Sequence, residues 1–129
     1  MKRLLDTTAY SSLKRGSNEV AAIVRESEEV ILSLVVLGEL LFGFHDGSRY
    51  KKNLAELEEF LNHPRVTLWG LTRATADRFG RIASQLKRQG TPIPNNDIWI
   101  AAQALETGSE VVSRDRHFHH VPGLVLLAI

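Results

Sequence analysis

The chain has 129 residues, of which 43% are hydrophobic and 24% are charged. These values are ordinary for one globular domain with a single core, so we expect one domain over residues 1–129. The absence of cysteine excludes a disulfide framework and a thiolate metal site, which leaves oxygen or imidazole ligands for any metal. The net charge of +1 indicates no particular partner.

No segment of the sequence is typical of membrane insertion or export. The first residues are basic and apolar, but Asp6 interrupts them before the apolar core of a signal peptide could form. No apolar run approaches the roughly 20 residues that cross a membrane. We therefore expect a cytoplasmic protein that does not bind a membrane.

Short apolar runs alternate with helical patterns along the chain. The expected strands are Arg3–Leu5, Val30–Leu32, Val66–Trp69, Glu110–Ser113 and Leu124–Leu127. The expected helices are Thr7 to about Gly16, Ser17 to a solvated acidic end at Glu26, Glu28 and Glu29, Ser33 through Phe44, Tyr50–Asn62, Thr72 to about Gln89, and one from the Asn95-Asn96 turn to about Gly108. This alternation predicts a three-layer α/β/α fold, in which helices cover both faces of a central, mainly parallel five-stranded sheet.

A carboxylate stands at the start of the helix that follows Pro94. The apolar face of this helix is formed by Ile98, Ala101, Ala102 and Leu105. Pro94 and the two asparagines after it predict a turn and an N-cap. Asp97 then falls in the first turn, where the helix dipole and free amides favour its charged form. Taken alone, this is only a charge that stabilises a helix start.

Three further carboxylates are expected at the same edge of the sheet. Asp6 and Asp115 each follow a strand directly. Glu39 lies in the uncharged run from Val30 to Phe44, so it either points into a pocket or is a lone surface charge. In an open parallel sheet the ligand crevice lies beyond the carboxyl ends of the strands. We therefore expect these three acids and Asp97 on one rim.

Clustered carboxylates repel one another, and a divalent cation relieves the repulsion. An incomplete shell of oxygen ligands suits Mg²⁺ or Mn²⁺, which would keep positions for water and a substrate phosphate. Such an ion can activate water for phosphodiester hydrolysis. With four of the 15 acidic residues in the pocket, the remaining surface has 16 basic residues against 11 acidic ones, which suits a polyanion.

Four stretches together resemble the successive motifs of PIN-domain ribonucleases, most closely the VapC toxins of toxin–antitoxin pairs. They are Leu4-Leu5-Asp6-Thr7, Ser33 with Gly38-Glu39-Leu40, Pro94 to Ala102, and Val112 to Phe118. The resemblance covers essentially the whole chain. It implies that Asp6, Glu39, Asp97 and Asp115 bind Mg²⁺ or Mn²⁺ and that Thr7 and Ser113 orient carboxylates or water. One departure is Val36, near a position where many relatives carry threonine.

The resemblance also implies an activity and partners. The expected activity is metal-dependent endoribonuclease cleavage by the toxin of a type II pair. The expected partners are the RNA substrate, a VapB-like antitoxin that wraps the toxin and blocks the pocket, and a second copy in a homodimer, with a larger hetero-oligomer as a further form. The basic face of the Thr72–Gln89 helix makes Arg73, Arg81 and Arg88 candidates for RNA phosphate contacts.

Other functional classes fit the sequence less well than a nuclease. The spacing of His117, His119 and His120 matches no standard zinc site, so we expect them in a loop at the pocket rim. A phosphoaspartate receiver-like domain would offer a lysine near the last strand, and none follows Asp115. A catalytically silent nucleic-acid or partner-binding module has no use for clustered carboxylates without neutralising partners.

Overall fold

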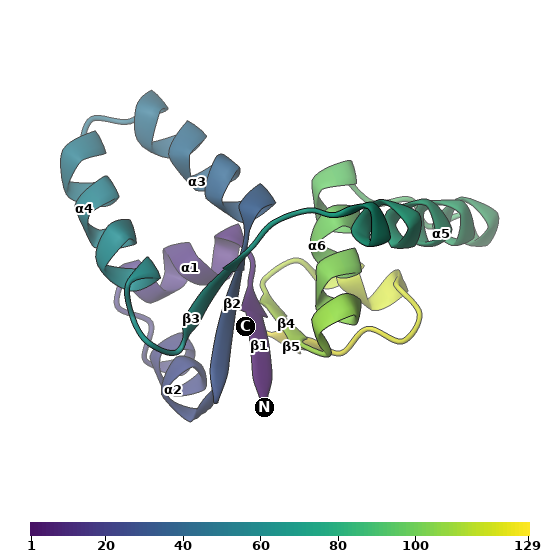
Figure 1. Cartoon of the computed structure of the whole chain (residues 1–129), viewed down its shortest axis with the longest axis horizontal. Helices are drawn as coiled ribbons and strands as arrows, with labels where there is room; N and C mark the ends of the chain where they lie inside the picture. Colours follow the sequence, from purple (N-terminus) through teal and green to yellow (C-terminus); the bar gives the residue numbers. More distant parts are fainter.

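The computed structural model describes all 129 residues, Met1–Ile129, and has five strands and six α-helices (Figure 1). The strands are β1 (Lys2–Leu5), β2 (Glu29–Ser33), β3 (Val66–Trp69), β4 (Glu110–Ser113) and β5 (Leu126–Ala128). The helices are α1 (Thr7–Lys14), α2 (Asn18–Glu26), α3 (Leu34–Asp46), α4 (Tyr50–Leu61), α5 (Arg73–Gln89) and α6 (Asn95–Thr107), with a short 3-10 helix at Arg116–His120. None of the helices combines the length and apolar character needed to span a membrane.

The five strands form one sheet in the order β3-β2-β1-β4-β5, and every neighbouring pair is parallel. In Figure 1, α1, α2 and α4 lie on one side of the sheet, and α6 with α5 lies on the other. The expected three-layer α/β/α fold is therefore confirmed. Receiver domains have the strand order 2-1-3-4-5, so the order found here excludes the receiver alternative.

Both faces of the sheet are covered, as the continuous apolar character of the strands requires. Leu5, Val30 and Val112 pack with α1 residue Ala9 on one face. Leu4, Ile31 and Val111 belong to the larger core that includes the apolar residues of α6. The strand residues in both groups are at most 1% exposed. Their burial fixes the pleat of the central strands, and with it the direction of the residues at their ends.

The register places three polar residues level with one another at the carboxyl edge of the sheet. Leu5 of β1 lies opposite Leu32 of β2 and Val112 of β4. The residues that follow these three in the chain are Asp6, Ser33 and Ser113. Because β1 has β2 on one side and β4 on the other, the strand order reverses here, at the point where α/β sheets bind ligands.

Some element boundaries differ from the sequence prediction. Glu29 begins β2 instead of closing α2, because its carboxylate accepts a hydrogen bond from Thr67 Oγ1 (2.9 Å) and lies 3.7 Å from Lys2 Nζ. The last strand starts two residues later than expected, since Pro122 and Gly123 form the turn before it. No side chain caps α6, so the predicted asparagine N-cap is wrong.

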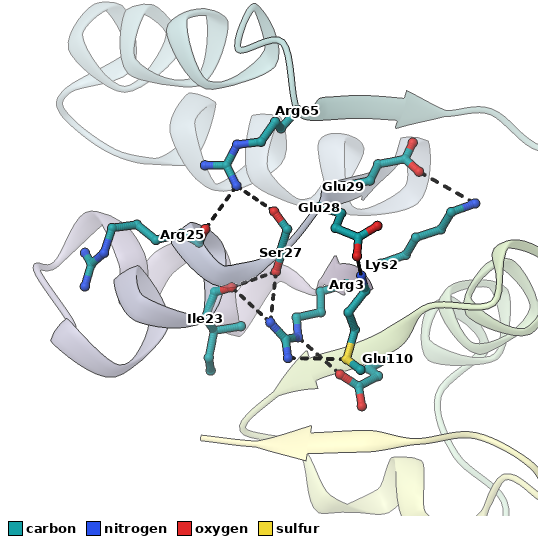
Figure 2. Close-up of polar contacts among 10 residues, drawn as sticks. Lys2, Arg3, Ile23, Arg25, Ser27, Glu28, Glu29, Arg65 and Glu110 are labelled. Carbon is teal, nitrogen blue, oxygen red and sulfur yellow. Dashed lines mark hydrogen bonds and ion pairs between the residues drawn. The ribbon is translucent and has the colours of Figure 1, made fainter.

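Two arginines hold the carboxyl end of α2 against the sheet (Figure 2). Arg3 Nε donates to Glu110 Oε1 at 3.1 Å, and Arg3 Nη1 donates to the Ile23 carbonyl and to Ser27 Oγ, each at 3.3 Å. Arg65 Nη1 donates to the Ser27 carbonyl at 2.6 Å. These bonds satisfy carbonyls that a helix end leaves free. We therefore assign the polar contacts of Arg3 and Arg65 to stabilising the fold and not to the functional site.

Replacing Arg3 by glutamine should lower the free energy of unfolding by about 2 kcal/mol. The Arg3 and Glu110 side chains are only 13% and 23% exposed, so the change leaves a half-buried carboxylate without its cation. The matched control is Lys2→Gln in the more exposed Lys2–Glu29 pair, where a change below about 0.5 kcal/mol is expected. Urea denaturation measures both; equal effects would contradict the structural role of Arg3.

Candidate functional site

A cavity of about 530 Å³ opens at the carboxyl edge of the sheet. Its lining contains four carboxylates and no basic residue: Asp6, Thr7, Thr8, Glu39, Pro94, Asn95, Asn96, Asp97 and Asp115. The structure thus brings together the four acids that the sequence placed on one rim. They come from the end of β1, from α3, from the first turn of α6 and from the segment after β4.

Asp6 is held by three hydrogen bonds at the start of α1. It is the N-cap of that helix, and its Oδ1 accepts from Ala9 N at 2.9 Å and from Thr8 Oγ1 at 2.6 Å. Its Oδ2 accepts from Ser113 Oγ. A carboxylate has about four acceptor positions, so these bonds fix Asp6 and leave one for a ligand.

Two hydroxyl groups join the start of α1 to the loop after β4. Ser113 Oγ donates to Asp6 and accepts from Asp115 N at 2.8 Å. Thr8 Oγ1 donates to Asp6 and accepts from Arg114 N at 3.0 Å. The sequence prediction named Ser113 but missed Thr8. The available signal was its place two residues after a strand-end acid, where a helix-start hydroxyl can reach the capping carboxylate.

Glu39 lines the cavity from α3. Of the two positions that the sequence allowed, a pocket or a lone surface charge, the structure shows the pocket. Thr7 Oγ1 donates to Glu39 Oε1 at 2.7 Å, as expected for a hydroxyl that orients a carboxylate. Asn96 Nδ2 donates to Glu39 Oε2 across a longer 3.4 Å. Asn96 therefore contacts a carboxylate of the site instead of capping its own helix. Val36, one turn before Glu39 on α3, is fully buried in the core.

Asp97 and Asp115 of the cavity form a close group with the neighbouring His117. One potential ligand atom from each lies within 4.8 Å of the other two. His117 Nε2 and Asp97 Oδ2 are joined by a hydrogen bond of 2.7 Å. None of the three histidines lines the cavity, but the 3-10 helix after Asp115 turns the His117 ring toward Asp97, a contact that the sequence did not predict. His119 and His120 are exposed.

Burial raises the pKa of two of the four carboxyl groups. Asp6 is 2% exposed, and burial raises its pKa more than bonds from Ser113, Thr8 and Ala9 lower it; the charge of Asp115 raises it further. The pKa of Asp97 is also raised, first by burial and then by the charges of Asp115 and Glu39, although His117 opposes the rise. Burial and the neighbouring acids therefore outweigh the groups that favour the charged form of Asp97.

The donor set fits a divalent cation. It consists of carboxylate oxygens with one imidazole nitrogen nearby, and no lysine or arginine lines the cavity to neutralise the acids. Oxygen-rich sites of this kind suit Mg²⁺ and Mn²⁺. A cation would lower the pKa of Asp6 and Asp97 by favouring their charged forms.

In the presence of a chelator, Asp115→Asn should raise the melting temperature at pH 7 by roughly 2 °C or more. The charge of Asp115 raises the pKa of both Asp6 and Asp97, and its own side chain makes no hydrogen bond that the change would remove. Below the ordinary aspartate pKa of 3.8, these two groups are protonated in the folded and the unfolded chain. The gain should therefore appear as pH rises above about 4 and be absent below it.

Differential scanning fluorimetry across pH 3.5–8 measures this gain. Asp77→Asn, on the exposed side of α5 outside the cavity, is the control and should show no such dependence. A lower melting temperature for Asp115→Asn at pH 7 without metal would contradict repulsion among the carboxylates.

The three arginines predicted to contact RNA lie on the exposed side of α5 and do not line the cavity. Arg81 Nη2 pairs with Asp77 Oδ2 at 2.6 Å, and Arg88 Nη1 donates to Ser84 Oγ at 2.7 Å. Arg73 is in the first turn of the same helix. Their contact with RNA stays a prediction.

Comparison with known proteins places this site in a family. The PIN domain family model matches residues 3–124. Ribonuclease VapC2 of Haemophilus influenzae (strain Rd) is 31% identical over 127 residues, covering 96% of this chain and 95% of the relative. The tRNA(fMet)-specific endonuclease VapC of Shigella flexneri is 33% identical over 97 residues, covering 74% and 72%.

The same relationship holds among solved structures. A DNA-bound VapBC complex from Salmonella typhimurium contains a chain with a TM-score of 0.87 and 27% identity, with 99% of this chain and 98% of that chain covered. The family model thus matches most of the sequence, and the Haemophilus influenzae relative is aligned over nearly its full length. The chain therefore belongs to the PIN domain family and, within it, to the VapC proteins.

Proposed function

We propose that this chain is a single-domain, Mg²⁺- or Mn²⁺-dependent endoribonuclease that acts as the toxin of a type II toxin–antitoxin pair. The observation that carries the proposal is the convergence of four carboxylates in one cavity with no basic residue in its lining. Relatives named ribonuclease or endonuclease support the same activity. Hydrolysis would join a water oxygen to the phosphorus of the RNA backbone and release a ribose oxygen, which takes a proton.

Asp6, Glu39, Asp97 and Asp115 would hold the cation. When bound, it would supply an activated water and neutralise charge on the phosphate. The protein groups around these acids hold them in position: Ser113 and Thr8 fix Asp6, and Thr7 fixes Glu39.

His117 contacts Asp97, one of the four proposed metal ligands. Its Nε2 lies 2.7 Å from Asp97 Oδ2, so a proton on this nitrogen favours the charged carboxylate and fixes its orientation. We assign it a positioning role. The sequence alone indicated no role for His117 in the site.

The proposal includes partners. The solved structure from Salmonella typhimurium is a VapBC complex, and another at 25% identity is VapBC-1 from nontypeable Haemophilus influenzae. For this chain we accordingly propose a VapB-like antitoxin that covers the cavity, a toxin homodimer and larger assemblies of the two proteins. Its substrate is RNA in the cytoplasm.

A silent binding module is the alternative in another functional class. It would leave several acids together in a cavity that raises the pKa of Asp6 and Asp97, with no compensating cation. Such an arrangement costs stability without a ligand that uses it. The raised pKa values therefore favour the metal-dependent enzyme.

Expression of the chain in a bacterial host tests the toxin role. The wild-type chain should arrest growth, and co-expression of the product of a small neighbouring reading frame should restore it. The control is Asp97→Asn, which should be expressed at the same level without arrest. Normal growth with a chain that cleaves RNA in vitro would count against the toxin role and leave the nuclease activity intact.

A further inference from the structure

A second polar cavity, of about 310 Å³, lies along α1 from the carboxylate cavity. It is lined by Tyr10, Ser11, Lys14, Arg15, Leu40, Phe44, Arg49, Lys52, Asn53 and Glu56. The two cavities are neighbours: Thr7 and Glu39 line the first, and the second is lined by Ser11, one turn after Thr7, and by Leu40, which directly follows Glu39. Their charges are opposite: four basic residues and one acid line the second cavity.

Tyr10, which lines this second cavity, has a buried hydroxyl without a partner in the protein. Tyr10 is 2% exposed, and its hydroxyl makes no hydrogen bond. Burial and the charge of Glu56 raise the pKa of Tyr10 to about 12, so the group is a donor at neutral pH. A buried donor without an acceptor costs free energy, which an acceptor inside the cavity would recover.

Basic side chains gather at the amino end of α4, where the helix dipole makes positive charge unfavourable. Arg49 is the N-cap residue and makes no side-chain capping bond, the first turn has no acidic residue, and Lys51 and Lys52 follow. The amino end of a helix carries partial positive charge and free amide donors, so nearby cations are unfavourable unless an anion binds. The long 3.9 Å Lys52–Glu56 contact is the only ion pair of these side chains. Lys14 Nζ lies over the rings of Tyr10 and Phe60, 5.6 and 5.9 Å from their centroids, but no contact within the fold accounts for Arg49.

We propose that this second cavity binds a backbone phosphate of the RNA, a few nucleotides from the bond that is cleaved. The proposal rests on the proposed ribonuclease function. Lys14, Arg49 and Lys52 supply the positive charge, and the Tyr10 hydroxyl supplies a neutral donor. From Thr7 to Lys14, α1 rises roughly 10 Å at 1.5 Å per residue. An RNA strand that runs along α1 therefore passes from the first cavity to the second within a few nucleotides.

An RNA strand suits this pair of cavities better than an acidic protein segment. RNA carries a phosphate at every nucleotide, so a strand whose scissile phosphate meets a cation among the four carboxylates has further phosphates at the distance of the basic cavity. An acidic protein segment along the same path would bring its carboxylates toward those of the first cavity. The alternation of one acidic and one basic cavity along α1 therefore favours RNA.

Affinity for a fluorescent oligoribonucleotide, measured with Mg²⁺ in an Asp97→Asn background that does not cleave it, tests the proposal. Arg49→Gln/Lys52→Gln should weaken binding about tenfold or more and reduce the salt dependence by about 0.7 in slope for each phosphate that the variant no longer neutralises. The matched control is Lys2→Gln/Arg25→Gln, which removes two exposed charges outside the cavity and away from α5 and should bind within about twofold of the background.

Tyr10→Phe isolates the hydroxyl. The ring should stay in place, since its edge-to-face contact with Phe60 at 5.3 Å does not involve the hydroxyl. Binding should weaken about threefold or more, while the melting temperature stays the same or rises because an unpaired buried group is removed. In the cleaving chain, a dinucleotide that fills only the carboxylate cavity should be cut equally well with and without Arg49→Gln/Lys52→Gln.

Three results would overturn the proposal. They differ in whether the proposed ribonuclease function also fails. If the wild-type chain cleaves RNA but the double variant binds as tightly as its control, the second cavity is not an RNA site and the nuclease function stands. If the double variant keeps its RNA affinity but loses affinity for a polyglutamate peptide, the occupant is an acidic protein segment. If the wild-type chain neither binds nor cleaves RNA, the proposed function fails as well.

Discussion

Replacing Asp97 by asparagine should lower the rate of Mg²⁺-dependent RNA cleavage by about 100- to 1,000-fold, the scale of losing one group in a preorganised charged site. Asparagine has nearly the same shape and keeps an oxygen that can face His117, but it removes the charge beside Asp115. The fold should be intact, because the buried residues of α6 are unchanged. Single-turnover cleavage of a labelled RNA by purified protein measures the effect.

The control for this change is Asp77→Asn, which removes an equal charge from the exposed face of α5. It should cleave at the wild-type rate, and circular dichroism should show the same helix content for both variants. Undiminished cleavage by Asp97→Asn would remove Asp97 from the catalytic set and contradict the proposed ligand arrangement.

Ser113→Ala should lower cleavage by about 10- to 100-fold, the usual effect of losing a group that orients a metal ligand. Ser113 donates to Asp6 and so lowers the pKa of a carboxyl that burial has already raised. Without this bond the pKa of Asp6 rises further, and a higher pH is needed to ionise it. The rise of cleavage rate with pH should therefore shift to higher pH, which a pH–rate profile at fixed Mg²⁺ measures.

Ser113→Thr is the matched variant, because threonine keeps the hydroxyl. It should recover part of the rate and return the profile toward that of the wild type. A rate loss of equal size in both variants, with an unshifted profile, would show that Ser113 only packs the end of β4 and does not act through Asp6.

The positions of the four acids could be predicted because they depend on strand ends. Asp6 and Asp115 follow apolar runs in the sequence, and parallel strands bring such positions to one edge of the sheet. Glu39 and Asp97 stand early in helices that leave this edge. The strand order itself required the tertiary structure, since several orders satisfy the same alternation of elements.

Side-chain directions in short segments could not be predicted in the same way. His117 reaches Asp97 only because a 3-10 helix follows Asp115, and Asn96 contacts Glu39 because α3 and α6 approach each other. The pKa of Asp97 depends on burial by those same neighbours. Each of these facts joins residues far apart in the chain, where local patterns carry no information.

The basic cavity likewise depends on residues that are far apart in the chain. The arginines of α5 stand out in the sequence because they recur on one helix with an apolar opposite face. The basic cavity combines the end of α1 with the start of α4, and its unpaired Tyr10 hydroxyl is identified only by burial. The sequence shows the basic pair Lys14-Arg15 and the basic stretch from Arg49 to Lys52, but not that they meet in one cavity.

Cleavage by metal-stripped protein tests the role of the carboxylate cavity most directly. Purified chain treated with a chelator should leave a labelled RNA intact, and titration of Mg²⁺ or Mn²⁺ should restore cleavage to a saturating rate in the wild type but not in Asp97→Asn. Cleavage that continues undiminished in the chelator would contradict a catalytic cation at Asp6, Glu39, Asp97 and Asp115.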